Sequence, residues 1–422
     1  MEPRKKILIL TADAGFGHRS AALALDAALK ERYGDVVETE IANPLDDKRT
    51  PFFLRDSQTD YDRWIKNFPE LYKIGYEASD ALVPKVLMEQ TLSTLLVDVM
   101  RDQLKKSEPD AVITTYPLYQ SAMAFVLNHR KHKIPLYTVI TDLSTVHRLW
   151  FNSKVTGTFV PNRHVAELAM SYGIPSEKIV ISGIPVHPDV VRETRSKSEI
   201  REELGLEKDI PTILAVSSRR VERMLDSLNV INHFGLPVQL IVVAGKDDDL
   251  YQSASEMEWH IPVKIYNFVE NMPTLMHASD IILCKAGGLI VTESLACGLP
   301  MILIDVIPGQ ETGNAEYVIA YGAGDMAETL MQLLELLSHW LRNDGSLYKK
   351  RALNAKMLGL PNSSYTIADV LWQAVNRIPQ PVLPRKHTHR RVIRQNRQRL
   401  RQSHAAVPSI DASIEKSGHE SA

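Results

Sequence analysis

Short apolar runs alternate with longer helical stretches along most of the chain, and this alternation limits the possible folds more than any other feature. Continuous apolar runs are typical of strands that are covered on both faces. When such strands alternate with helices, they indicate βαβ units and a parallel sheet. The expected strands form two series, at 7–11, 36–41, 111–115, 136–141, 157–160 and 179–182, and at 212–216, 238–244, 263–266, 280–284 and 301–304.

The charged stretch 193–209 contains no such run and separates the two series. Eleven strands are many for a single sheet, and a chain of 422 residues suits two or three domains. We therefore predict an α/β protein with two similar domains and a cleft between them.

Composition excludes several classes of protein. Lys and Arg (49) nearly balance Asp and Glu (51), so we expect no nucleic-acid partner of the kind that overall basic charge attracts. The two cysteines, Cys284 and Cys297, have no metal-ligand spacing and indicate a reducing cytosol. The apolar run 7–10 is too short for a secretory signal, and no run approaches the roughly 20 residues of a membrane span. We expect a cytoplasmic protein whose membrane contact is peripheral.

An aromatic segment could provide such contact. Its aromatic residues recur at helical spacing among basic side chains, and they are Tyr61, Trp64, Phe68, Tyr72 and Tyr76. The pattern fits a stripe that faces the core. It also fits a flap that places aromatic rings at a membrane interface and basic groups on lipid phosphates.

The stretch 379–422 begins with three prolines, continues with many arginines and ends in small polar residues. It contains too few apolar residues to fold alone, so we expect a disordered basic tail. Such a tail is either solvated without a fixed partner, or an electrostatic anchor to an anionic membrane or to nucleic acid.

The first chemical motif follows the first expected strand. Gly15, Gly17 and His18 lead into a helix expected at 19–33. Glycines at such a turn let the backbone approach an anion at the helix N-terminus. The three-glycine dinucleotide fingerprint is absent, which argues against a nicotinamide cofactor. The imidazole of His18 could remove a proton near neutral pH, or it could merely cap the turn.

A second motif, Lys285-Ala286-Gly287-Gly288, follows the strand at 280–284 and opens a helix that carries Glu293. Open parallel sheets bind ligands at this end of their strands. The glycines and the helix N-terminus suit phosphate, and a carboxylate such as Glu293 can accept hydrogen bonds from two ribose hydroxyls. The alternative is a helix carboxylate that faces solvent.

The third motif opens the helix after the strand at 301–304. It presents Gln310, Glu311 and Asn314 together. Amide and carboxylate groups at a helix start suit the recognition of sugar hydroxyls. The alternative is a capped helix with exposed polar side chains.

In this order, the motifs resemble the lipid-directed glycosyltransferases of family 28 over residues 6–378. The similarity is strongest to monogalactosyldiacylglycerol synthases and processive diacylglycerol glucosyltransferases. Its points are Gly15–His18, Thr141-Asp142 with His147 and Trp150, Gly183–Val186, Phe268–Met272, Lys285–Glu293 and Pro308–Asn314.

The resemblance implies the GT-B architecture of two Rossmann-like domains. Residues 1–192 would form the acceptor (lipid) domain, completed by a last helix at 364–378, and residues 193–363 would form the UDP-sugar donor domain. It also implies a UDP-glucose or UDP-galactose donor, inversion at the anomeric carbon, and diacylglycerol as acceptor at an anionic membrane surface. The UDP-sugar would be a substrate, and we expect no cofactor and no metal.

Roles follow for individual residues. His18 would be the general base, and Asp142 would orient that base or the acceptor. Backbone at Phe268 and Val269 would meet uracil. Further residues would bind the donor: Lys285, Gly287, Gly288, Glu293, Gln310, Glu311 and Asn314. The acceptor and phosphate loops would contribute Gly15, Gly17, His147, Trp150 and Pro185.

One segment departs from the family pattern. The strand at 212–216 usually leads into a glycine-rich loop, but here Ser217-Ser218-Arg219-Arg220 follows. Arg219 or Arg220 could replace the lost backbone contacts with a bidentate phosphate clamp. Alternatively, the bulkier loop obstructs the donor site and leaves a weak or altered enzyme.

Three other functions stay open at this point. The first is transfer to another lipid-linked acceptor. The second is a UDP-sugar 2-epimerase, which shares the two-domain architecture but needs no lipid-binding flap. The third is a non-catalytic protein that binds nucleotide sugar or membrane.

Overall fold

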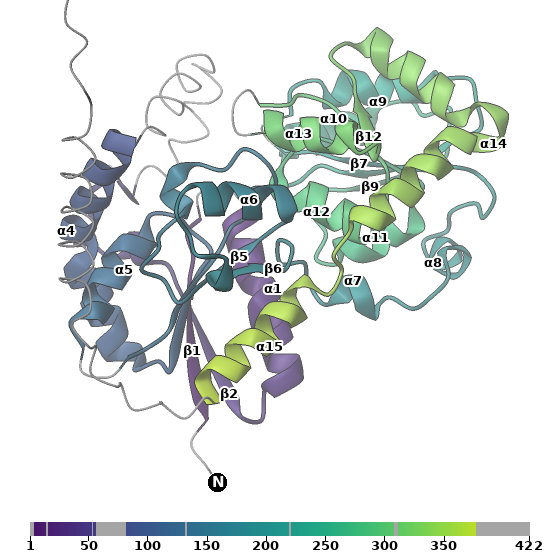
Figure 1. The fold of residues 1–422 in the computed structure, drawn as a ribbon. Coiled ribbons are helices and arrows are strands. Elements are labelled where there is room, and N and C mark those ends of the chain that lie inside the picture. Colours follow the sequence, from purple (N-terminus) through teal and green to yellow (C-terminus); the bar gives the residue numbers. More distant parts are fainter. Residues whose placement is uncertain are drawn as a thin grey trace, which may run out of the picture. The chain divides into compact units, whose positions relative to one another are not determined.

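The computed structural model describes residues 4–13, 16–52, 54–55, 82–130, 133–218, 221–307 and 311–376. The aromatic segment 61–76 and the tail 379–422 lie outside these residues, as do Gly15, Arg219, Arg220 and Gln310. Two parallel sheets of six strands each form the frame of the described chain (Figure 1). The predicted α/β class is therefore confirmed.

The first sheet has the strand order β2-β1-β3-β4-β5-β6. Its strands are β1 (Lys5–Leu10), β2 (Val37–Ala42), β3 (Ala111–Thr114), β4 (Leu136–Val139), β5 (Gly157–Val160) and β6 (Ile179–Ile181). The α-helices of this part are α1 (Phe16–Tyr33), α4 (Leu82–Ser107), α5 (Tyr119–Asn128) and α6 (Arg163–Ser171). Short 3-10 helices are η1 (Pro44–Asp46), η2 (Arg148–Trp150) and η3 (Ser176–Lys178).

The second sheet has the order β12-β11-β10-β7-β8-β9. Its strands are β7 (Thr212–Val216), β8 (Gln239–Val243), β9 (Val263–Tyr266), β10 (Ile281–Cys284), β11 (Met301–Leu303) and β12 (Gly324–Met326). Along the chain, the last strand of the first sheet is followed by α7 (Asp189–Arg192) and α8 (Lys197–Glu203), which precede the second sheet. The later helices are α9 (Met224–Asn232), α10 (Asp248–Glu256), α11 (Met272–Ala278), α12 (Gly288–Ala296), α13 (Thr312–Ala320), α14 (Leu330–Leu358) and α15 (Ser363–Asn376).

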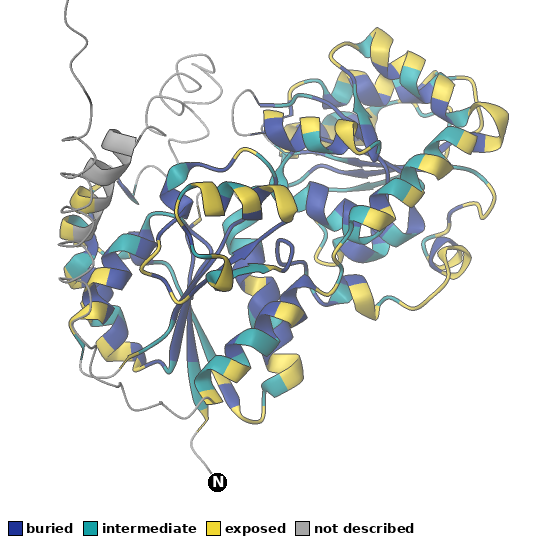
Figure 2. Cartoon of the chain, viewed as in Figure 1, coloured by how far each residue is buried: buried dark blue, intermediate teal, exposed yellow. Residues whose placement is uncertain are grey.

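Strand β1 shows why the apolar runs became parallel strands. Successive side chains of a strand point to opposite faces. Ile7 and Ile9 join the apolar cluster under α1 and α15, whereas Leu8 and Leu10 join the cluster under α4 and α5. Both faces are covered by helices, so the strand is buried along most of its length (Figure 2).

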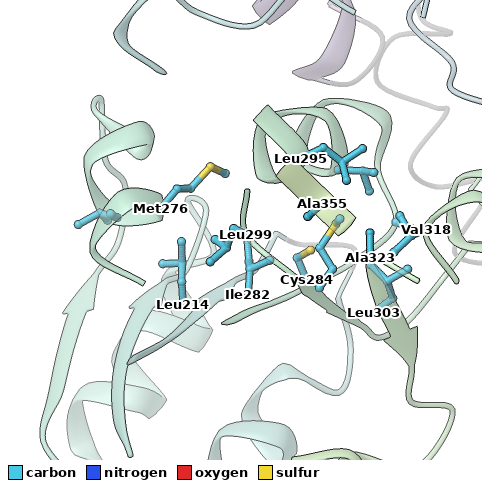
Figure 3. Packing of buried hydrophobic residues seen from close by; sticks show 14 of the residues in the cluster. Leu214, Met276, Ile282, Cys284, Leu295, Leu299, Leu303, Val318, Ala323 and Ala355 are labelled. Atoms are coloured by element: carbon cyan, nitrogen blue, oxygen red, sulfur yellow. The ribbon is translucent and has the colours of Figure 1, made fainter. Parts of the chain in front are cut away.

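The second sheet repeats this arrangement. Leu214 of β7 faces one cluster, and its neighbours Ile213 and Ala215 face the other. The first of these clusters includes Ile282 and Cys284 of β10 (Figure 3). Burial raises the pKa of the Cys284 thiol to about 12, so this cysteine is a packing residue.

The expected strands coincide with observed ones to within two residues at each end. Strand β12 was missed, because its three residues, Gly-Asp-Met, contain no apolar run. A Cβ at Gly324 would lie 2.3 Å from the Met301 carbonyl oxygen, so this edge strand needs a glycine at that position.

The last described helix, α15, corresponds to the helix expected at 364–378, and it packs against α1. Ile367 and Leu371 are buried in the core of the first sheet. The rings of Tyr33 and Trp372 stack with centroids 5.0 Å apart, and the Tyr33 hydroxyl donates a 2.7 Å hydrogen bond to Asp369.

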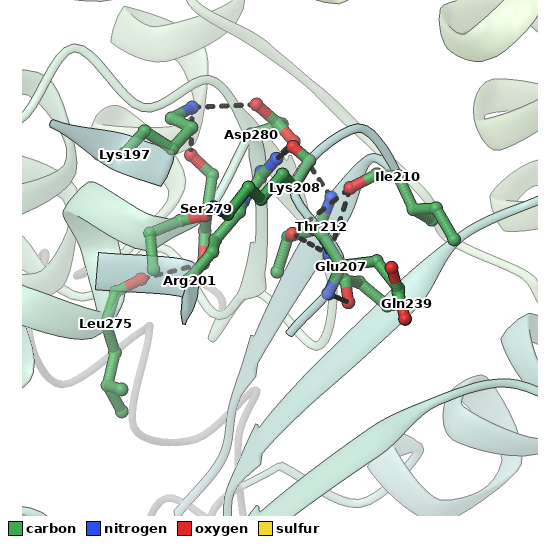
Figure 4. A network of polar contacts seen from close by, with 11 residues as sticks. Lys197, Arg201, Glu207, Lys208, Ile210, Thr212, Gln239, Leu275, Ser279 and Asp280 are labelled. Atoms are coloured by element: carbon green, nitrogen blue, oxygen red, sulfur yellow. Dashed lines mark hydrogen bonds and ion pairs between the residues drawn. The ribbon is translucent and has the colours of Figure 1, made fainter. Parts of the chain in front are cut away.

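A network of polar side chains lies at the amino ends of β7 and β10 in the second sheet (Figure 4). Asp280, just before β10, accepts hydrogen bonds from the Thr212 amide (2.8 Å), the Lys197 ammonium (2.7 Å) and the Arg201 guanidinium (2.5 Å). Burial alone would favour the neutral acid, but these cations and the Thr212 amide lower the pKa of Asp280 below its usual value.

We predict that Asp280→Asn lowers the free energy of unfolding by about 2 kcal/mol near neutral pH, because charge-assisted hydrogen bonds are lost around buried Arg201. A carboxylate with a lowered folded-state pKa stabilises the protein above its unfolded-state pKa of about 3.9 and loses this effect as the pH falls. Urea unfolding of both proteins should therefore show a difference that shrinks toward acid pH. A constant difference would contradict this account.

Candidate functional site

Each sheet has one point where the chain reverses the direction in which strands are added. In the first sheet this point lies between β1 and β3, and in the second between β7 and β10. Loops leave the carboxyl ends of such strand pairs in opposite directions and open a crevice in which ligands bind. The three sequence motifs follow β1, β10 and β11, so all three lie at the carboxyl edge of a sheet.

The loops after β1 and β3 are tied together by hydroxyl groups. The Thr115 hydroxyl lies 3.0 Å from both the Thr11 hydroxyl and the His18 carbonyl oxygen. Among the residues that the structure describes, none would come within 4 Å of a Cβ at Gly17, so their packing does not demand a glycine there.

His18 is the third residue of α1, and two aromatic rings lie beside its imidazole. Its Nδ1 lies 3.0 Å from the Thr141 hydroxyl. The rings of Tyr116 and Trp150 lie with centroids 5.0 and 6.0 Å from the imidazole. Burial lowers the pKa of His18 to about 4, against a smaller opposing effect of the Thr115 backbone.

The imidazole is therefore neutral near pH 7, as a general base must be. When the Thr141 hydroxyl accepts a hydrogen bond from Nδ1–H, Nε2 carries the free lone pair. The contact with Thr141 is thus compatible with the tautomer that can take a proton at Nε2.

Asp142 reaches this cluster through Trp150. The buried Trp150 ring donates a 2.8 Å hydrogen bond from Nε1 to Asp142 Oδ2, and the same ring lies against His18. The predicted role of Asp142 in orienting the base stays a prediction. The residue that hydrogen-bonds His18 Nδ1 is its neighbour Thr141, which belongs to the same sequence motif but was predicted to have no role of its own.

His147 and Pro185 lie in well-packed surroundings. His147 is buried and caps η2, where its Nδ1 accepts a 3.2 Å hydrogen bond from the Leu149 amide. Pro185 is buried next to Val186, whose amide donates to the Ser363 hydroxyl at 3.0 Å. Their predicted contact with the acceptor stays a prediction.

At the second sheet, α12 begins directly after Gly287. A Cβ at Gly288 would lie 2.7 Å from the Thr141 carbonyl oxygen, so a side chain cannot be accommodated without movement. The Thr141 carbonyl oxygen therefore packs against the glycine turn, and the Thr141 hydroxyl lies within hydrogen-bond distance of His18.

Buried polar groups fix the loop beside this turn. Lys285 forms an ion pair with Glu311, which is 4% exposed and also accepts a 3.2 Å hydrogen bond from the Ile307 amide. Asn314 donates to the Ala286 carbonyl oxygen at 3.0 Å and accepts from the Leu143 amide at 3.3 Å. In this arrangement Glu311 and Asn314 brace the loop, and their predicted contacts with sugar and phosphate stay predictions.

Glu293 lies farther along α12, on the same side of the sheet. Within the described residues, its carboxylate has no hydrogen-bond or ion-pair partner, and burial raises its pKa to about 7. A half-buried carboxylate without a partner costs free energy unless a ligand donates hydrogen bonds to it. Glu293 is thus available to a ligand that carries hydroxyl groups.

Phe268 and Val269 follow β9 at the same edge. The Phe268 side chain is 53% exposed, whereas Val269 packs partly against the core. This pairing places an accessible aromatic ring beside an anchored backbone segment. Both predicted donor residues therefore lie on the carboxyl edge that carries Gly287 and Glu293.

Comparison with known proteins decides the family. Residues 18–186 match the family model of monogalactosyldiacylglycerol (MGDG) synthase, and residues 215–356 match that of the glycosyltransferase family 28 C-terminal domain. The monogalactosyldiacylglycerol synthase of Spinacia oleracea is 32% identical over 389 residues, which cover 89% of this chain and 74% of that protein. The chain belongs to the monogalactosyldiacylglycerol synthase family. The probable synthase of Glycine max, 31% identical over 389 residues and covering 89% of this chain and 72% of that protein, agrees.

Membership of the monogalactosyldiacylglycerol synthase family confirms the resemblance seen in the sequence and makes the chain a glycosyltransferase. Solved structures agree on the fold. Acinetobacter baumannii MurG has a TM-score of 0.56 at 16% identity and covers 88% of this chain and 100% of its own. The calicheamicin glycosyltransferase CalG4 has a TM-score of 0.57 at 13% identity and covers 90% and 100%.

The GT-B architecture is thereby confirmed for this member of the monogalactosyldiacylglycerol synthase family. An epimerase of Neisseria meningitidis, solved with UDP-GlcNAc, has a TM-score of 0.57 at 16% identity and covers 87% of this chain and 100% of its own. Because an epimerase matches as well as a transferase, the fold alone does not separate these activities. The sequence relatives favour transfer.

The described residues of this family member contain no group of three or more His, Cys, Asp or Glu side chains that could hold a metal ion. No helix among them is both long and apolar enough to cross a bilayer.

Proposed function

We propose that this chain is an inverting galactosyltransferase that moves galactose from UDP-galactose to diacylglycerol. The supporting observation is the position of Thr141. Its hydroxyl lies 3.0 Å from His18 Nδ1, and its carbonyl oxygen lies against Gly288 at the start of α12. A single residue thus joins the proposed base to the proposed phosphate turn. The names of the sequence relatives favour galactose and diacylglycerol.

The reaction needs a base on the acceptor side and stabilisation of the leaving group on the donor side. The acceptor hydroxyl gives its proton to His18 Nε2 while its oxygen forms a bond to the anomeric carbon of galactose. The bond from that carbon to the phosphate oxygen breaks, and UDP leaves with the electron pair. Attack from the face opposite the diphosphate inverts the anomeric configuration.

The donor side would be held by the second sheet. The amide groups and dipole at the N-terminus of α12 would stabilise charge on the departing diphosphate. The Glu293 carboxylate would accept hydrogen bonds from the ribose hydroxyls. The Lys285 ammonium, fixed by Glu311, would lie beside the phosphates.

We place the reaction at the surface of an anionic membrane on its cytoplasmic side, since diacylglycerol resides in bilayers. Radiolabelled UDP-galactose and UDP-glucose incubated with diacylglycerol vesicles, with and without anionic lipid, test the whole proposal. Labelled glycolipid from UDP-galactose is expected. Label on another lipid-linked acceptor, isomerised sugar without lipid, or bound but unreacted donor would each support one of the other functions.

The low pKa of His18 predicts the pH profile. A base must be neutral to act, and the pKa of about 4 keeps His18 neutral far below the ordinary histidine range. The kcat/KM for the acceptor should therefore stay nearly level as the pH falls from about 7 to about 5. A decline with a midpoint near the ordinary histidine pKa of about 6.5 would show that His18 is exposed to solvent or is not the base.

A further inference from the structure

The loop after β8 carries strained backbone at the carboxyl edge of the second sheet. Gly245 and Lys246 both have left-handed backbone, with φ of +68° and +67°. Glycine adopts this conformation freely, but a residue with a Cβ does so at a cost of about 1 kcal/mol or more. Such strain persists where the surrounding structure holds the residue in place.

Two contacts hold this loop between its neighbours. A Cβ at Gly245 would lie 2.2 Å from the Ser217 carbonyl oxygen, so the loop packs directly on the segment that follows β7. The Lys246 amide donates a 3.1 Å hydrogen bond to the Asn267 carbonyl oxygen in the segment that follows β9. Gly245 and Lys246 thus contact the segments that follow β7 and β9 on either side of their own strand, β8.

The Lys246 side chain lies over Phe268. The ammonium nitrogen lies 4.3 Å from the centroid of the Phe268 ring, within the range of a cation–π contact. Phe268 is 53% exposed, so most of its ring would otherwise be free to rotate in solvent. The contact restricts an exposed aromatic ring on the edge where the nucleotide is expected.

We propose that Lys246 is a positioning residue for the donor nucleobase: it holds the Phe268 ring in the orientation that stacks uracil. This inference rests on the proposed function, because a uridine nucleotide must bind at this edge. An ordered ring loses less conformational freedom when a base stacks on it, so ordering improves affinity. The ring does not touch the anomeric carbon, and Lys246 should affect donor binding rather than the chemical step.

Lys246→Met removes the charge and keeps most of the side-chain length. It should weaken the binding of both uridine and UDP by about three- to tenfold, the size expected for a cation–π contact. The KM for the UDP-sugar should rise by the same factor, with kcat unchanged. Lys246→Arg keeps a cation over the ring and should retain wild-type affinity. Unchanged binding by Lys246→Met, or equal losses in both variants, would overturn the inference.

A double-mutant cycle tests whether Lys246 acts through Phe268. In a Phe268→Leu background, Lys246→Met should have no further effect on uridine binding. Additive losses would show that Lys246 acts by another route. Inhibition by inorganic pyrophosphate, which has no base, should be equal in wild type and Lys246→Met. A loss of pyrophosphate affinity as large as the loss for UDP would make Lys246 a phosphate ligand instead.

Lys349→Met is a matched control. The Lys349 ammonium lies 5.9 Å from the Tyr348 ring on α14 and also donates a 2.6 Å hydrogen bond to the Asp344 carbonyl oxygen, so a cation over a ring is removed away from the donor edge. This variant should bind UDP like wild type.

These experiments also distinguish a wrong role for Lys246 from a wrong proposed function. Wild-type protein that transfers sugar, but whose Lys246→Met variant binds donor normally, contradicts this inference alone. Wild-type protein that binds no UDP contradicts the proposed function itself.

Discussion

Replacing His18 with alanine should lower kcat by about 10²- to 10⁴-fold, the usual cost of losing a general base. The imidazole is neutral, is oriented by the Thr141 hydroxyl and lies at the reversal point of the first sheet. UDP affinity should change little, because every proposed donor contact comes from the second sheet. Steady-state kinetics with saturating UDP-galactose and diacylglycerol vesicles would measure the first effect, and calorimetry with UDP the second.

His129→Ala is the matched control for this experiment. His129 follows α5 at the surface, where its Nδ1 lies 2.7 Å from the Phe125 carbonyl oxygen. Its removal should leave kcat within a few-fold of wild type. If His18→Ala were equally active, the proton would have to leave by another route, and the role of His18 would reduce to packing among Tyr116 and Trp150.

Glu293→Ala should weaken UDP binding by roughly 2–4 kcal/mol, because two charge-assisted hydrogen bonds to the ribose are lost. The wild-type carboxylate has no partner within the described residues, so its removal breaks no internal contact that the structure shows. Folding stability should therefore hold while calorimetry shows the loss of affinity. Glu316→Ala, an exposed carboxylate on α13, is the control and should bind UDP normally. Unchanged affinity in Glu293→Ala would place the ribose elsewhere.

The raised pKa of Glu293 adds a pH signature to the same experiment. With a pKa of about 7, the carboxyl is half protonated at neutral pH in the free protein, and ribose hydroxyls bind best to the ionised form. Affinity should rise as the pH increases through about 7. Uridine has no phosphate that titrates in this range, so its pH dependence isolates Glu293. Glu293→Gln should remove that dependence.

The strands were predictable because each is a continuous apolar run that both faces bury. Strand β12 lacks such a run, since Gly324 and Asp325 supply no apolar side chain. It pairs with β11 through backbone hydrogen bonds, and only the approach of Gly324 to Met301 reveals why a glycine stands there. Local sequence does not contain that tertiary contact.

The location of the candidate site could be predicted in outline, but its supporting contacts could not. His18 and Glu293 both lie on helices, α1 and α12, that begin at a glycine motif after the carboxyl end of a strand. Thr141 was missed as a partner of His18, because 123 residues separate the two in sequence. Lys246 was missed because what distinguishes it is a left-handed backbone angle, and the pattern of residues in the sequence does not indicate that angle.

The packing of α15 on α1 also decides when the first half of the molecule can finish folding. Domains made first on the ribosome usually fold first. Here the core beneath α1 lacks Ile367 and Leu371 until the end of the described chain has been synthesised, on the order of tens of seconds later. The strands of the second sheet, in contrast, come from one continuous stretch between 212 and 326. The apolar clusters of that sheet also contain Trp340 and Ala355 of α14, so the half that is translated later has its full core only shortly before Ile367 and Leu371 complete the half that is translated first.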